Sequence, residues 1–107
     1  MPKFLVQASY TADGLKGLVK DTASGRRAAV TEMIEAAGGT VEGFYFSLGD
    51  YDALVVVDVP DTATVAGLCV GVSASGLART NTRALLTVEE MDQALAKPVS
   101  YKPPGTA

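Results

Sequence analysis

VEGFYFSLGDYDALVVVDV, residues 41–59, is the stretch of sequence that decides the fold. Residues 41–48 are rich in aromatic and branched side chains, and residues 53–59 form an apolar, β-branched run that Pro60 closes. Between them GDYD, residues 49–52, has the residue types of a turn. The stretch therefore predicts two strands joined as a β-hairpin.

The chain before the hairpin predicts one strand and one interrupted helix. Residues 3–10 alternate with the period of a strand, and Thr11 then caps a segment with apolar residues at helical spacing. TASG at residues 22–25 interrupts that spacing, and Ser24 is the expected cap where the helix resumes. The pattern predicts a single broken helix that ends at the two glycines of residues 38–39.

A second helix and a fourth strand follow the hairpin. Asp61 or Thr62 caps a segment with helical apolar spacing that stops at Gly76, and residues 77–86 alternate again. The resulting order, strand, helix, strand, strand, helix, strand, is that of the ferredoxin-like fold. We therefore predict the α+β class, with a βαββαβ order and helices on one face of a four-stranded antiparallel sheet.

The C-terminal residues predict a short appendage to this domain. Thr87 and Glu90 form a capping box, so a helix is expected to run to about Ala96. Residues 97–107 contain three prolines and favour an extended path. At 107 residues the chain is expected to be one domain over residues 1–107, with residues 97–107 as an extended tail.

The strand over residues 53–59 is apolar on both faces. Valine and alanine occupy one side, while Leu54 and Val56 occupy the other. A strand of this kind is typically covered from both sides, but the helices of this fold cover one face only. A partner sheet is the simplest cover for the other face, so we predict a homodimer or a larger homo-oligomer.

Composition excludes several classes of function. Nine Lys and Arg against twelve Asp and Glu give a net charge of −3, the wrong sign for nucleic acid or an anionic membrane. The chain has no histidine, which excludes Ser-His and Cys-His catalytic pairs and histidine-ligated haem. A single cysteine and the lack of a signal-like or membrane-spanning apolar run indicate a cytoplasmic protein. No metal cluster or phosphate loop is recognisable, so no metal or cofactor is expected.

Topology brings several polar residues to one rim of the predicted sheet. The end of the first strand, the hairpin turn and the start of the fourth strand meet there. They carry Tyr10, Asp50, Tyr51, Asp52 and Arg79. An arginine with carboxylates and phenols could orient a small polar molecule, and a desolvated Asp could act as a general base. Alternatively, the aspartates make hydrogen bonds within the turn and the tyrosine packs.

Three further residues are candidates for ligand binding. Arg26 and Arg27 lie where the broken helix resumes, so backbone N–H groups and guanidinium groups could hold an anion there, or the arginines are simply solvated. Tyr45 could line a cavity between sheets or be a core or interface residue. Arg79 and Arg83 share one strand face, which suits either a carboxylate ligand or an interface ion pair.

The sequence also resembles the GYD domain family over nearly its whole length. The similar blocks are SYT at residues 9–11, SGRR at 24–27, FYF at 44–46, GDYD at 49–52, LLT at 85–87 and YKPPG at 101–105. The resemblance implies a bacterial-type protein of the dimeric α/β barrel group, in which two ferredoxin-like sheets face each other. It implies no settled activity, because the family is named for its sequence and not for a reaction.

Two hypotheses for function follow. The first is an oligomeric small-molecule-binding protein, with or without cofactor-free catalysis on a small polar or anionic substrate. Its pocket would lie between sheet and helices, with the rim residues and Arg26 near the mouth. The second is a non-enzymatic structural or sensing oligomer, in which the same motifs set turns and the subunit interface.

Overall fold

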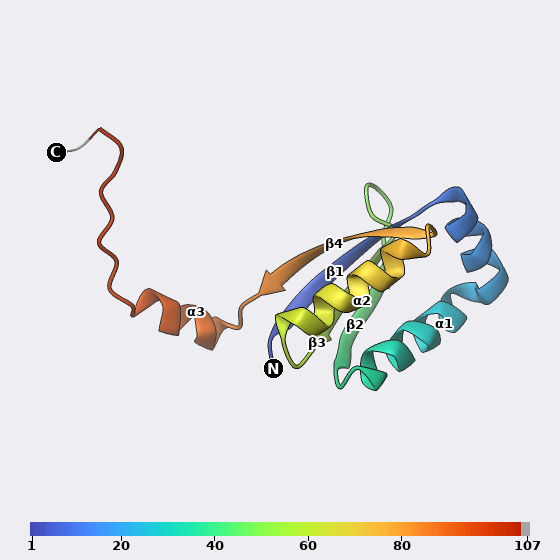
Figure 1. Cartoon of the computed structure of the whole chain (residues 1–107), viewed down its shortest axis with the longest axis horizontal. Coiled ribbons are helices and arrows are strands. Elements are labelled where there is room, and N and C mark those ends of the chain that lie inside the picture. Colours follow the sequence, from blue (N-terminus) through green and yellow to red (C-terminus); the bar gives the residue numbers. More distant parts are fainter. Residues whose placement is uncertain (106–107) are drawn as a thin grey trace.

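The computed structural model describes residues 1–105. Its elements, in chain order, are β1 (Lys3–Tyr10), α1 (Ala12–Ala36), β2 (Thr40–Phe46), β3 (Ala53–Asp58), α2 (Thr62–Ala74), β4 (Ala78–Leu85) and α3 (Val88–Leu95). The described strands form one antiparallel sheet in the order β2-β3-β1-β4. Helices α1 and α2 lie on the same side of it (Figure 1). The predicted α+β class and four-stranded antiparallel sheet are confirmed, and the arrangement is consistent with a ferredoxin-like fold.

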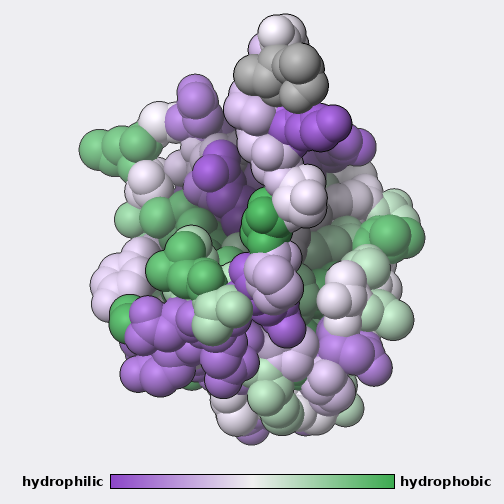
Figure 2. Space-filling view, turned by 90° about the vertical axis from the view of Figure 1, so that its left-hand side faces the viewer, coloured by the Kyte–Doolittle hydropathy of each residue, from purple (hydrophilic) through white to green (hydrophobic). Residues whose placement is uncertain are grey.

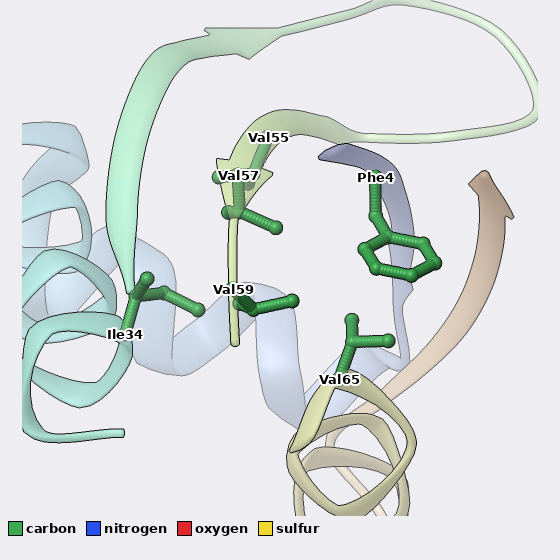
Figure 3. Packing of buried hydrophobic residues seen from close by; sticks show 6 residues of the cluster. All are labelled: Phe4, Ile34, Val55, Val57, Val59 and Val65. Carbon is green, nitrogen blue, oxygen red and sulfur yellow. The ribbon is translucent and has the colours of Figure 1, made fainter. Parts of the chain in front are cut away.

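The core lies between the sheet and these two helices. Val57 and Val59 at the end of β3 are completely buried, and Phe4, Ile34 and Val65 pack around them (Figure 3). Each residue comes from a different element or connection, so this aliphatic cluster joins β1, β3, α1 and α2. Burial of each such side chain contributes about 1.5–3 kcal/mol, which makes the cluster the main source of stability.

A bulge in β2 changes which side chains of this strand face the core. Strict alternation would place Val41 and Phe44 on opposite sides of the sheet. The register shifts between Val41 and Gly43, because an extra residue is inserted there. Val41 therefore pairs with Val57 and packs against the core on the same face as Phe44.

Helix α1 is broken at Thr22, and the cap differs from the predicted one. Thr22 has φ +70° and ψ +164°, and its Oγ1 accepts a hydrogen bond of 3.3 Å from the backbone N–H of Gly25. Ser24 was the expected cap, but the threonine two residues earlier takes this role, because the chain leaves the helical conformation at Thr22. A β-branched residue in this region of φ is strained.

The C-terminal arm, defined as residues 86–105, leaves the body of the molecule. A compact domain of this length has a radius of gyration of about 13 Å. The observed value is 17.2 Å, and the longest dimension is 60 Å against 32 and 23 Å for the other two. Figure 1 shows the cause, since α3 and the residues after it extend away from the sheet. The capping box is present as predicted, while residues 97–105 form neither helix nor strand and the last two residues of the predicted tail lie outside the described residues.

Replacing Thr22 by glycine tests the strain at the break in α1. Glycine adopts positive φ without steric cost and loses only a few tenths of a kcal/mol as a helix cap. We expect Thr22→Gly to raise the free energy of unfolding by about 1 kcal/mol, measured by urea unfolding. Thr22→Ala is the matched control: it keeps the strain, removes the capping oxygen and should lower stability by about 1 kcal/mol. A loss of stability in both variants would show that Thr22 is unstrained.

Candidate functional site

A cavity of about 360 Å³ lies between the helices and the sheet. Four of the core residues drawn in Figure 3 form part of its wall, namely Ile34, Val55, Val57 and Val65. The remaining apolar lining comes from β1, β2 and both helices, and includes Val6, Phe44, Leu18, Val30, Met33, Leu68 and Val72. Because the wall is predominantly hydrocarbon and the volume is that of a small-molecule site, the cavity suits an apolar guest.

The break in α1 adds an ion pair to this apolar wall. Asp21 and Arg26 stand on either side of the break, and both line the cavity. Arg26 Nη1 lies 3.4 Å from Asp21 Oδ2, and about a third of the arginine side chain is exposed. A guanidinium group that is partly withdrawn from water at an apolar cavity can bind the carboxylate of a ligand by exchanging its partner.

On α2, Cys69 contributes the softest polar group of the cavity. It is half-buried, as a residue on the apolar stripe of a helix should be, and its Sγ lies 3.1 Å from Thr82 Oγ1. This contact gives the thiol a hydroxyl neighbour rather than a charged one.

The rim predicted from topology is present, and its hydrogen bonds hold the hairpin turn. Asp52 Oδ2 accepts a bond of 2.8 Å from the backbone N–H of Tyr10, and its own N–H donates to the carbonyl of Ala8 at 2.8 Å. The carbonyl of Asp50 accepts a bond of 2.7 Å from Ser9 Oγ. The two aspartates thus tie the turn to the end of β1, which is the behaviour of turn residues.

The predicted site residues are divided among four places. Tyr10 and Arg26 border the cavity. Asp50, Tyr51 and Asp52 lie in the hairpin turn and are not part of the cavity wall. Arg79 pairs with Ser9 on the sheet face away from the helices, Tyr45 pairs with Leu54 on that same face, and Arg27 is exposed on α1. The structure therefore brings Tyr10 and Arg26 to one pocket and places the other candidates elsewhere.

The sheet face opposite the helices, called here the uncovered face, has an apolar centre. Leu5, Leu54 and Val56 lie there on the two central strands, and no described element packs over them. At one end Lys3 Nζ bonds to Glu42 Oε1 at 2.8 Å and to Asp58 Oδ1 at 2.9 Å. These hydrogen bonds, above all the one to Glu42, raise the pKa of Lys3. At this end of the face the charge of Lys3 is therefore paired with two carboxylates.

The edge of the uncovered face along β4 carries exposed basic side chains. Arg79, Asn81 and Arg83 alternate there and are exposed. Within residues 1–105 neither arginine has a carboxylate within salt-bridge distance. The face is therefore an apolar centre with an unpaired basic edge.

Two residues of these surfaces escaped prediction from the sequence. Asp21 precedes Arg26 by five residues across the expected break, and that spacing was the available signal. Gln7 lies in the middle of β1 between Leu5 and Ser9, and its Oε1 is buried without a hydrogen-bond partner among the described residues. A buried amide oxygen without a donor is costly, and nothing in the sequence pattern of β1 indicated it.

Neither a cluster of candidate metal ligands nor a membrane-spanning helix occurs in the part of the chain that the structure describes. Residues 1–105 contain no group of three or more acidic or cysteine side chains placed to hold a metal ion. Every helix in this range is too short or too polar to cross a bilayer.

Comparison with known proteins agrees with these observations. Residues 4–95 match the family described as the GYD domain. A protein of Thermus thermophilus named "Glutamine synthetase and cystathionine beta-lyase binding protein" is 34% identical over 92 residues, which cover 85% of this chain and 95% of that protein. No solved structure matches significantly. The matched region includes all the described strands and helices except the first residue of β1, and the chain belongs to the GYD domain family.

Proposed function

We propose that this protein is a binding module that associates with metabolic enzymes, and that glutamine synthetase and cystathionine beta-lyase are the first partners to test. The observation that carries the proposal is the Thermus relative, whose name states that it binds these two enzymes and which matches this chain over nearly its full length. An uncovered apolar sheet face and a projecting arm supply surfaces of the kind that protein partners use.

Binding accounts for the polar groups of the cavity better than catalysis does. Asp21 is the one carboxylate among the described lining residues, and it already pairs with Arg26. General acid-base catalysis needs a group free to exchange a proton with the substrate. The aspartates of the turn are held by backbone hydrogen bonds and lie outside the cavity wall.

The module is a homodimer in this proposal, joined through the uncovered faces of its two sheets. A second sheet would cover Leu5, Leu54 and Val56, which the described helices leave open. Two sheets packed in this way form the dimeric α/β barrel that the family resemblance implies.

A second candidate function is the binding of a small amphipathic molecule in the cavity. The specific observation is the pairing of a 360 Å³ apolar space with the guanidinium of Arg26 at its wall. Such a site fits a molecule with a hydrocarbon body and one carboxylate. A binding module with a ligand pocket of this kind would act as a sensor.

The enzyme partners are tested by surface plasmon resonance with the immobilised full chain. Purified glutamine synthetase and cystathionine beta-lyase from the same organism are expected to bind with dissociation constants of about 1 µM or tighter, the range of specific protein complexes. An unrelated oligomeric enzyme of similar size serves as the control. Failure of both enzymes to bind above that control would contradict the proposed function.

The cavity is tested by thermal unfolding in the presence of octanoate and, separately, octanol. A ligand that binds only the native state raises the melting temperature, so octanoate at a large excess over its dissociation constant should raise it by several degrees. Arg26→Met should reduce the effect of octanoate and leave that of octanol unchanged, whereas Arg27→Met, the neighbouring exposed arginine, should leave both unchanged. An octanoate effect that is equal in all three proteins would exclude Arg26 from binding.

A further inference from the structure

Helix α3 in the C-terminal arm is specified locally by its capping box. Thr87 Oγ1 accepts a hydrogen bond of 3.1 Å from the N–H of Glu90, and Glu90 Oε1 accepts one of 2.9 Å from the N–H of Thr87. These bonds fix the start of α3, and they hold the pKa of Glu90 below its ordinary value. Among the described residues no hydrogen bond or salt bridge joins α3 to another helix or strand.

One side of α3 is apolar and exposed, although a packed helix would bury such a side. Val88, Met91 and Leu95 fall at helical spacing on one stripe and are exposed by 75%, 47% and 71%. In the view onto the arm side of the molecule, hydrophobic and hydrophilic side chains lie interspersed on the surface (Figure 2). A helix of eight residues is not stable in water by itself, so this stripe requires a cover.

We propose that the arm packs on a second copy of this chain, with the stripe of α3 against the rim of the partner's uncovered sheet face. Glu89 and Asp92 then lie beside the basic edge formed by Arg79 and Arg83 of that copy. This inference rests on the proposed homodimer and adds to it the segment and the charges that hold it together.

Charge complementarity favours a second copy over a different protein. Asp92 adjoins the apolar stripe of α3 and Glu89 lies one turn away on the same flank, whereas Glu90 is used by the capping box. Arg79 and Arg83 are exposed and lack carboxylate partners among residues 1–105. Because every copy carries both the acidic arm and the basic edge, a twofold axis satisfies both contacts at once.

The area of the uncovered face is smaller than a stable interface needs, which also favours packing of the arm on a second copy. Four strands spaced about 4.8 Å apart, paired over lengths of about 20 Å, make a footprint of roughly 400 Å². A standard stable interface buries about 800 Å² on each partner. The arm begins at the end of β4, which is the edge strand of this face, so it is positioned to add area to the same contact.

Charge reversal with mixing tests the contact and shows whether it forms between chains. One variant carries Arg79→Glu and Arg83→Glu, and the other carries Glu89→Arg and Asp92→Arg. Each variant alone places like charges together, so the amides of α3 should exchange hydrogen about tenfold faster than in the wild type. Mixing the two variants pairs the reversed arm of one chain with the reversed edge of the other, and protection should return.

A control and three outcomes make the test decisive. Lys16→Glu with Lys20→Glu changes the charge by the same amount on α1 and should leave α3 protected. If the wild type is dimeric by light scattering while α3 exchanges like an unstructured chain, the inference about the arm is wrong and the homodimer stands. If the protein is monomeric, both are wrong. If α3 becomes protected only when glutamine synthetase or cystathionine beta-lyase is added, the arm binds the enzyme and the proposed contact between copies is overturned.

Discussion

Strand β3 carries apolar side chains on both faces, and the helices of the chain cover only one of them. Val55 and Val57 point into the core, while Leu54 and Val56 belong to the uncovered face. Burial of the first pair helps to hold the domain together, whereas the second pair is only half-buried and leaves part of its apolar surface in contact with water. In the proposed dimer a second copy covers that face, and the arm after β4 gains a surface on which to pack.

The same arrangement leaves space on the covered side. The break at Thr22 changes the direction of α1, and it places Asp21 and Arg26 together at the wall of an apolar cavity. A partly exposed ion pair of this kind contributes little to stability, because water screens it. In the proposed function this pair offers a cation to a ligand, and the domain then combines a ligand pocket on one face of the sheet with an association surface on the other.

Local patterns in the sequence predicted the strands, the hairpin and the helix caps at Thr11, Asp61 and Thr87 because each depends on neighbouring residues. The cap inside the broken helix was predicted wrongly at Ser24. The same patterns could not reveal the bulge at Val41, since an inserted residue changes the face without changing residue types. They placed both Arg26 and Arg79 near the mouth of the pocket, but Arg79 lies on the other face of the sheet, because its side depends on the register between β1 and β4. The capping box predicted α3, but a cap specifies where a helix starts and not what it packs on.

The central claim is that a second copy of the chain covers the uncovered face. The molar mass of the protein in solution tests this claim most directly. Light scattering after size-exclusion chromatography at tens of micromolar chain should give twice the chain mass of 11.0 kDa for the wild type. Val56→Glu places a charge in the proposed interface and should give a monomer with unchanged circular dichroism. Val70→Glu, at an exposed valine of α2, should remain a dimer. A monomeric wild type, or a Val56→Glu variant that stays dimeric, would contradict the account.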